Sequence, residues 1–290
     1  MLDVTRLKVL VAVARHGSVT AAAQALHYAQ PSVCHHLARL EAETGSRLVH
    51  RAGRGIRLTD AGRLLADRAE EILGRLAAAE SELAAHTGLR SGRVRLAAFP
   101  SALGTFVPQA AASFAAAHPA VDLSFTEAAP AEAIRLLRAG EVEVALHFGH
   151  PGDAGDLTGL RHKTLMTEAT HLVTPADWPG DELADHAGRR WIGGCERCRG
   201  QLLRDCAAAG FVPDIRFTTD DYVAVQSLVA AELGVTTLPA LALAAHRNPR
   251  VRTVPLPAPG RQVSVAVHGE PPDPPATSAL LTHLHAAAAA

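Results

Sequence analysis

Three cysteines gathered in the second half of the chain are the residues whose spacing most directly suggests chemistry. Cys195 and Cys198 are three residues apart, and Cys206 follows eight residues later. Thiolates at such spacings bind a metal ion or close into a disulfide, and the arginines between them would lower the thiol pKa. No fourth metal ligand is evident nearby, so ordinary packing residues are the simpler interpretation, and we expect no metal and no cofactor.

A second group of polar side chains follows a Gln-Pro-Ser sequence near the N-terminus. Pro31 suits the first turn of a helix, and Val33, Leu37 and Leu40 recur at helical spacing, which predicts a buried stripe. The opposite face would carry Ser32, His35, His36 and Arg39. A helix with such a polar, positive outer face fits the major groove of DNA, where the side chains of its first turns reach base edges.

The elements around this helix complete a helix-turn-helix pattern with a wing. Apolar spacing predicts a helix over 4–15, which Gly17 ends, and a short alanine-rich helix over 20–26. Two short helices joined by a tight turn are typical of DNA-binding heads. Residues 48–51 and 56–58 predict a β-hairpin whose glycine-rich turn would place Arg54 against the DNA backbone or in the minor groove.

The distribution of charge favours a polyanionic partner for this head. Residues 1–63 carry nine basic and four acidic groups, whereas the whole chain of 290 residues has a net charge of −1. The composition, 48% hydrophobic and 20% charged, predicts a folded protein of two or three domains. We see no secretory signal and no membrane span, and four cysteines make no disulfide scaffold, so we expect a cytoplasmic protein.

A long helix is predicted after the wing. Thr59 can cap it, and its apolar positions continue to about His86 at spacings that alternate between four and three residues. This is the pattern of a coiled-coil seam, which predicts that two copies of the chain dimerise through it. The seam consists of Leu65, Ala69, Ile72, Leu76, Ala79 and Leu83. Gly88 and Gly92 mark a hinge after the helix.

From Arg93 onward, strands and helices alternate. We expect strands at 93–98, 121–126, 142–148, 171–174, 191–192, 214–217, 235–238, 251–255 and 262–268. We expect helices at 103–118, 130–139, 201–210 and 222–232, and an alanine-rich helix at the end of the chain. Repeated strand-helix-strand units predict parallel sheets that bind ligands at the carboxyl ends of their strands. Two such sets predict two lobes with a cleft between them.

Candidate ligand contacts follow from these strand ends. Ser101 would lie near a helix start, where backbone N–H groups favour an anion. The expected contacts are Phe99, Pro100, Ser101, Ala129, His147, Phe148, Gly193, Gly194, Cys195, Thr219 and Asp220.

The sequence AAAQALHYAQPSVCHHLARLEAETGSRLVHRAGRGIRLTDAG, which ends at Gly62, resembles the winged helix-turn-helix of LysR-type transcriptional regulators. The shared features are the alanine-rich second helix, Gln-Pro-Ser, a Leu-Glu pair, a Gly-x-x-Leu turn, Arg51 and Leu-Thr-x-x-Gly. The resemblance implies base-edge contacts from Gln30, Pro31 and His35 and a minor-groove contact from Arg54. Together with the outer face of the helix and Arg51 of the shared motif, the expected DNA contacts are Gln30, Pro31, Ser32, His35, His36, Arg39, Arg51 and Arg54. The sequence departs from the family at Ala29 and Cys34, where Ser or Thr is usual, and at His35, where Arg is frequent.

The resemblance covers the whole chain and implies an α/β multidomain fold. Its parts would be a winged helix-turn-helix over 1–58, a dimerisation helix over 59–87, and a two-lobed effector domain over 92–290 that is similar to periplasmic binding proteins. Chain crossings near 164–168 and 257–262 would assign 92–164 and 262–290 to one lobe and 165–261 to the other. Ala129 departs from the hydroxyl that is frequent in the family, which weakens the case for a carboxylate ligand.

These observations predict a regulator that binds promoter DNA under the control of a small-molecule effector, and not an enzyme. RNA polymerase and further copies of the chain, as a homodimer paired into a homotetramer, would be its other partners, with no role for a membrane. One alternative is a redox or metal sensor that uses the three cysteines. Another is a cleft enzyme or a solute-binding protein, but the sequence shows no nucleophile elbow, no glycine-rich phosphate loop and no export signal.

Overall fold

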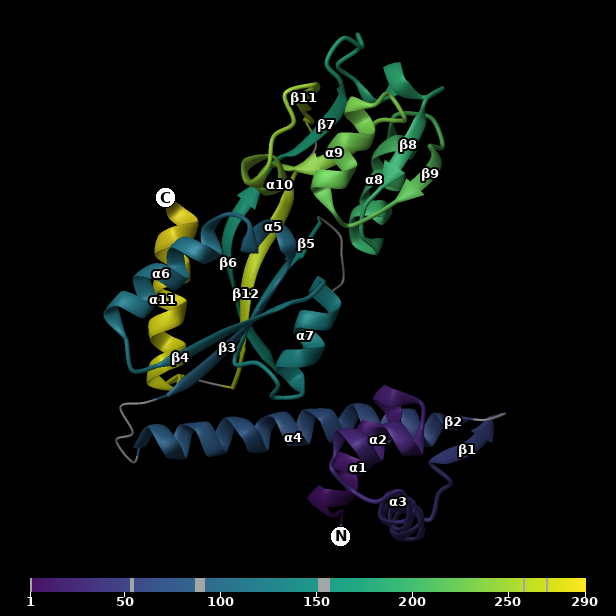
Figure 1. Ribbon diagram of the computed structural model, residues 1–290, viewed down its shortest axis with the longest axis vertical. Coiled ribbons are helices and arrows are strands. Elements are labelled where there is room, and N and C mark those ends of the chain that lie inside the picture. Colours follow the sequence, from purple (N-terminus) through teal and green to yellow (C-terminus); the bar gives the residue numbers. More distant parts are fainter. Residues whose placement is uncertain (1, 53–54, 87–91, 151–156, 258, 270) are drawn as a thin grey trace. The chain divides into compact units, whose positions relative to one another are not determined.

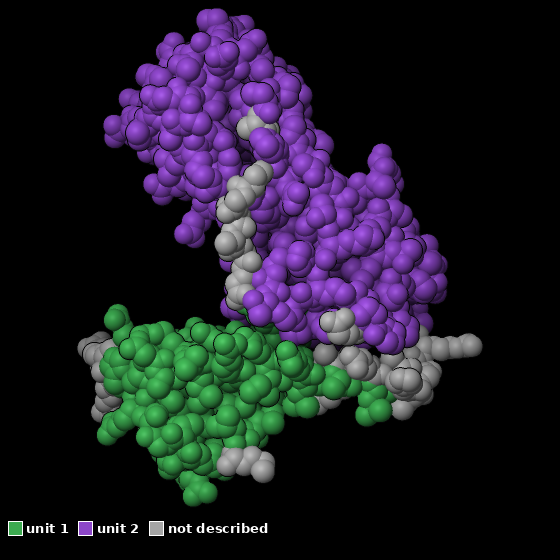
Figure 2. Space-filling view, turned by 180° about the vertical axis from the view of Figure 1, so that it is seen from behind, with its two compact units in different colours: residues 1–88, 136–141 green, residues 89–135, 142–290 purple. Residues whose placement is uncertain are grey.

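The computed structural model describes residues 2–52, 55–86, 92–150, 157–257, 259–269 and 271–290. The chain divides into two compact units (Figure 2). One consists of residues 1–88 with 136–141, and the other of residues 89–135 with 142–290. None of the helices in the described ranges combines the length and the apolar character that a membrane crossing requires.

The first unit begins with three helices, α1 (Val4–His16), α2 (Val19–Ala25) and α3 (Gln30–Thr44). Asp3 caps α1 by accepting a hydrogen bond from the Arg6 amide, and Ser18 caps α2 through the Ala21 amide. The buried stripe of α3 packs against the apolar face of α1, as the helical spacing predicts. Ala29, at the position before α3, makes no side-chain cap, so the first amides of this helix lack one.

A wing of two antiparallel strands, β1 (Val49–Ala52) and β2 (Gly55–Leu58), follows. The Glu41 carboxylate ties it to α3 by accepting hydrogen bonds from the amides of Leu48 (2.8 Å) and Val49 (3.2 Å). Thr59 caps α4 (Asp60–His86) through the Gly62 amide at 3.0 Å. A Cβ atom on Gly62 would lie 2.0 Å from the Leu48 carbonyl oxygen, so the chain needs a glycine where α4 passes the wing.

The predicted seam on α4 divides into two parts. Ala69 is fully buried in the core of its own head, and Leu65 packs against the same core, so Ala69 is not available to a partner chain. Ile72, Leu76 and Leu83, in contrast, are 43%, 40% and 67% exposed. The prediction was therefore wrong at Ala69, because the apolar stripe of α4 packs against the head's own core there, whereas further along the helix it is exposed.

The second unit contains a five-stranded sheet in the order β4-β3-β5-β12-β6. Its strands are β3 (Arg93–Ala98), β4 (Asp122–Glu127), β5 (Val144–Gly149), β6 (Leu160–Glu168) and β12 (Arg261–His268). β3 is parallel to β4 and β5, whereas β12 is antiparallel to both of its neighbours. The helices are α5 (Pro100–Leu103), α6 (Phe106–Ala117), α7 (Pro130–Arg138) and α11 (Pro275–Ala289), although residues 136–138 at the end of α7 belong to the first unit. Helices α6 and α11 lie side by side (Figure 1).

The same unit contains a second lobe with two small sheets. One has the order β10-β7-β11, and in the other β8 is parallel to β9. The strands are β7 (Thr170–Pro175), β8 (Arg190–Gly193), β9 (Asp214–Thr218), β10 (Thr236–Pro239) and β11 (Val251–Pro255). The helices are α8 (Glu196–Ala208), α9 (Tyr222–Ala230), α10 (Ala240–Ala245) and a 3₁₀ turn, η1 (Leu183–His186). The fully buried Trp191 lies at the centre of this lobe.

The chain passes between the lobes twice, from β6 to β7 and from β11 to β12. Residues 164–168, where the sequence predicted the first passage, belong instead to β6, because they pair with β12. The helix expected over 103–118 is two helices, and the helix expected to start at Gln201 begins at Glu196. In both cases apolar spacing alone missed the helix ends.

Candidate functional site

The polar face predicted on α3 lies on the surface of the head. Gln30, Pro31, Ser32, His35 and Arg39 are exposed, and His36 is half-buried. Tyr28, which no spacing pattern in the sequence marks as functional, stacks its ring on His36 with 5.9 Å between the ring centroids. The side chain of Arg51 and the whole of Arg54 lie outside the described residues.

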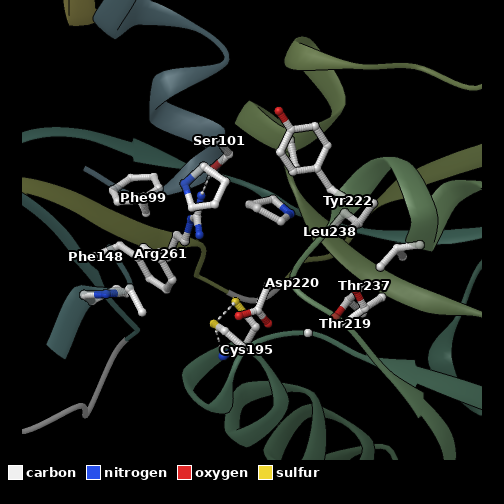
Figure 3. Close-up of a pocket in the computed structure, with 18 of the residues that line it drawn as sticks. Phe99, Ser101, Phe148, Cys195, Thr219, Asp220, Tyr222, Thr237, Leu238 and Arg261 are labelled. Carbon is white, nitrogen blue, oxygen red and sulfur yellow. Dashed lines mark hydrogen bonds between the residues drawn. The ribbon is translucent and has the colours of Figure 1, made fainter. Parts of the chain in front are cut away.

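A cavity of about 190 Å³ lies in the second unit, with walls from both lobes (Figure 3). Phe99, Phe148 and Arg261 stand on one side of it, and Thr237 and Leu238 on another. Of the ligand contacts expected from the sequence, those that line it are Phe99, Pro100, Ser101, Ala129, Phe148, Gly194, Cys195, Thr219 and Asp220. Strand ends of two separate lobes thus converge on one space, as parallel-sheet topology leads one to expect.

Two expected contacts do not line the cavity. His147 precedes Phe148 on β5, and because side chains alternate along a strand, it lies on the other face of the sheet. Burial lowers the pKa of His147 to about 4, assisted by the nearby charges of His162 and Arg197, so the imidazole is neutral. Gly193, the last residue of β8, is buried next to Ile215.

Arg261 is the central polar group of the cavity and was missed by the sequence analysis. Its side chain is only 3% exposed. Nε donates to the Glu168 carboxylate at 2.6 Å, and Nη2 donates to the Ser101 hydroxyl at 2.8 Å. The guanidinium carbon lies 4.0 Å from the ring centroid of Phe148 and 5.0 Å from that of Phe99, within the range of cation–π attraction.

The position of Arg261 results from the two chain passages between the lobes. Glu168 ends β6 and Arg261 begins β12, and a Cβ atom on Gly260 would lie 1.7 Å from the Glu168 carbonyl oxygen. The second Glu168 oxygen accepts a hydrogen bond from the Leu241 amide at the start of α10 (2.7 Å). One ion pair therefore holds both passages, α5 and α10 together. Nothing in the local sequence indicates that Arg261 is buried, because it is a charged residue that follows a stretch rich in proline and glycine.

Hydroxyl groups and carboxylates complete the lining. Thr219, Thr237 and Tyr222 come from the second lobe, and the carboxylates are those of Glu127 and Asp220, both on exposed residues. Because Glu168 already balances the charge of Arg261, the cavity has no surplus positive charge. No histidine is among the described residues that line it, so Cys195 has no adjacent general base of that kind.

Cys195 caps α8 and touches Cys198. The two Sγ atoms are 3.1 Å apart, and the Cys195 sulfur also accepts the Cys198 amide at 3.4 Å. The hydrogen bond from the Cys198 thiol, with help from that amide, lowers the pKa of Cys195 to about 7 against the opposing effect of burial. The pKa of Cys198 is raised by the same thiol contact and by burial.

Cys206 does not join this pair. It is fully buried in the core around Trp191, and burial raises its pKa to about 12. The structure therefore separates one member of the three-cysteine group that the sequence suggested. Among the described residues, no three His, Cys, Asp or Glu side chains are placed to hold a metal ion.

Comparisons with known proteins agree with a DNA-binding head on a ligand-binding body. Residues 87–289 match the LysR substrate binding domain, and residues 4–63 match the bacterial regulatory helix-turn-helix protein, lysR family. The chain is 36% identical over 234 residues to the HTH-type transcriptional regulator YofA of Bacillus subtilis, which covers 80% of each chain. It is 28% identical over 267 residues to the uncharacterized regulator YcgK of the same organism, which covers 82% of this chain and 80% of YcgK.

Solved structures show the same architecture. CbnR, a LysR family transcriptional regulator, aligns with a TM-score of 0.63 at 23% identity over 99% of both chains. Full-length CbnR complexed with its target DNA gives a TM-score of 0.54 at 25% identity over 99% of this chain and 100% of that one. A full-length OxyR variant from Pseudomonas aeruginosa aligns with a TM-score of 0.67 at 22% identity, over 98% of this chain and 95% of that chain.

Head, long helix and two-lobed body together define a ligand-responsive DNA-binding protein. The chain belongs to the LysR family of transcriptional regulators, which bind promoter DNA and small-molecule effectors. The family is not enzymatic, so these findings exclude the cleft enzyme, and they do not favour a redox or metal sensor as the primary class.

The buried ion pair generates a stability prediction. We expect Arg261→Met to lower the free energy of unfolding by about 3–5 kcal/mol, because it leaves the Glu168 carboxylate buried without its partner. The double variant Arg261→Met/Glu168→Leu should regain most of that loss, since no uncompensated charge remains. Urea denaturation measures both. Arg216→Met, which breaks an exposed pair with Asp214, is the matched control and should change stability by less than about 1 kcal/mol. Equal losses in the single and double variants would contradict this role of the pair.

The thiol geometry generates a pH prediction. We expect alkylation of Cys195 by iodoacetamide to accelerate between about pH 6 and pH 8 with a midpoint near its pKa of about 7, because only the thiolate reacts. Cys198→Ala removes the thiol hydrogen bond and should move that midpoint upward. Quantitative peptide mass spectrometry follows both, with buried Cys206 as the unreactive internal reference. A Cys195 midpoint that is the same in both proteins would disprove the proposed cause.

Proposed function

We propose that α3 reads base edges of promoter DNA and that a small molecule in the body's cavity controls this binding. The observation that supports this proposal is that one face of α3 is polar and exposed, whereas its opposite face is a buried apolar stripe. The exposed face carries the residue types that DNA contacts require. Gln30 and Pro31 at the start of α3 would contact base edges, with His35 one turn further on. Arg39, Arg51 and Arg54 would contact the phosphate backbone and the minor groove.

The effector would occupy the cavity around Arg261. The described residues give Nη1 of Arg261 no hydrogen-bond partner, so its N–H groups are available to an oxygen atom of a ligand. Phe99, Phe148 and Leu238 would pack against an apolar part of that ligand. A molecule that binds both lobes favours one arrangement of them, and this shift in population would be transmitted to the DNA-binding heads.

Two copies of the chain would associate through the exposed part of α4, formed by Ile72, Leu76, Ala79 and Leu83. Such a dimer places two recognition helices on successive major grooves, and pairs of dimers would form a tetramer. We further propose a cytoplasmic location and recruitment of RNA polymerase, both of which follow from regulation at a promoter.

DNA binding tests the assignment of α3. With the intergenic DNA upstream of the chain's own gene, Gln30→Ala should reduce the preference for the specific site by about 5- to 100-fold, because it removes a contact that distinguishes bases. Arg39→Ala should weaken binding to all sequences alike and lessen its salt dependence, since phosphates carry no sequence information. Gel shifts at several salt concentrations measure both.

The control for these gel shifts is Arg216→Ala, which removes an exposed arginine from β9 and should leave DNA binding unchanged. Wild-type sequence preference in Gln30→Ala would contradict the placement of α3.

Sedimentation velocity tests the dimer. Ile72→Lys/Leu76→Lys should convert the chain to a monomer and reduce affinity for a two-half-site operator at least tenfold, because charges would face each other across the seam. Val212→Lys replaces an equally apolar residue that is 84% exposed in the body, and it should remain oligomeric. A double variant that sediments like the wild type would disprove this interface.

A further inference from the structure

Cys195 and Cys198 form a C-x-x-C pair at the amino end of α8, in the wall of the effector cavity. Their sulfur atoms are 3.1 Å apart. Cys195 lies beside Asp220 (Figure 3). A disulfide bond is about 2 Å long, so closure requires the sulfurs to approach by only about 1 Å. Two thiols held this close, without a metal site among the described residues, are arranged to bond to each other.

The two thiols differ in reactivity. Cys195 is half-exposed and has the lowered pKa, which suits it to attack, whereas the more buried Cys198 keeps its proton. The groups that face the pair are Asp220, which disfavours the thiolate of Cys195, and Arg261, which favours it. Reactive cysteines in C-x-x-C pairs at helix N-termini show this division between an attacking and a resolving thiol.

The remaining cysteines are not arranged for this chemistry. Cys206 lies in the core around Trp191, and Cys34 is exposed on α3 in the other unit, so neither has a second cysteine beside it. The cavity, by contrast, admits a small molecule to the Cys195 sulfur. Access, proximity and unequal reactivity thus coincide at one pair among the four cysteines of the chain.

We propose that Cys195 and Cys198 close into a reversible disulfide by exchange with a small-molecule disulfide that enters the cavity. The Cys195 thiolate attacks one sulfur of that molecule, breaks its S–S bond and releases one thiolate. Cys198 gives its proton to water and attacks the Cys195 sulfur, which breaks the mixed disulfide and releases the second thiolate. The two protein thiols lose two electrons and two protons, and the small molecule is reduced to two thiols.

Oxidation would change the cavity as an effector site. It replaces a thiolate and a thiol beside Asp220 and Arg261 with a neutral disulfide and fixes the first turn of α8. Effector affinity, and with it DNA binding, would then depend on whether Cys195 and Cys198 are reduced or joined in a disulfide. This consequence rests on the proposed function, whereas formation of the disulfide does not.

Thiol mapping tests the disulfide. The full chain is equilibrated with glutathione disulfide, quenched in acid, alkylated and mapped by peptide mass spectrometry. We expect a Cys195–Cys198 disulfide in the wild type and in the control Cys206→Ala. Cys198→Ser should accumulate glutathione on Cys195, and Cys195→Ser should react at least tenfold more slowly. A wild-type chain that stops at a glutathione adduct, keeps both thiols or pairs with Cys206 would overturn the proposal.

Gel shifts of the same samples test its consequence. Oxidation should change the affinity for the upstream DNA at least threefold in the wild type and in Cys206→Ala, and leave Cys195→Ser/Cys198→Ser unchanged. A disulfide that forms without any change in affinity would overturn the regulatory part. Reduced protein that binds no promoter DNA would overturn the proposed function instead, and the thiol map would still decide whether the disulfide forms.

Discussion

The body of this regulator depends on the buried contact between Arg261 and Glu168. Its two chain passages meet where Gly260 leaves no room for a side chain, and the ion pair lies directly beside this meeting point. Burial of two charges costs free energy that their attraction repays only with good geometry and further hydrogen bonds. Ser101 and the Leu241 amide supply those bonds, so one contact sets the positions of α5 and α10 together.

That contact also sets the electrostatic character of the cavity. A buried arginine would ordinarily favour an anion, but here its charge is balanced by Glu168, and the rim adds the carboxylates of Glu127 and Asp220. The expectation of an anion at Ser101 relied on a helix start. Its hydroxyl instead accepts a hydrogen bond from Arg261, and α5 is only four residues long. Recognition would therefore depend on hydrogen bonds and apolar packing more than on net charge.

The DNA-binding head and the residues at the strand ends could be predicted from the sequence because both depend on local patterns. The stripe of Val33, Leu37 and Leu40 predicts which face of α3 is exposed, and residues after parallel strands meet at one edge of a sheet. The role of Arg261 was missed because it depends on Glu168, 93 residues away, and no local pattern reports such a partner. The seam on α4 failed at Ala69 for a related reason, since periodicity shows that a stripe is buried but not against what.

The two polar centres of the cavity influence each other. The hydrogen bond from Cys198 is the main stabiliser of the Cys195 thiolate, and Arg261 adds a smaller contribution, so a ligand that draws on the charge of Arg261 also changes the thiolate population. Such coupling is reciprocal: if the ligand lowers thiolate content, the thiolate lowers the affinity for the ligand by the same factor. A ligand with a negative group should thus bind more tightly when Cys195 and Cys198 form a disulfide, and a cationic ligand should bind more tightly when Cys195 is a thiolate. The charge of the effector and the thiol state of Cys195 and Cys198 are consequently linked, so that each determines the effect of the other on binding.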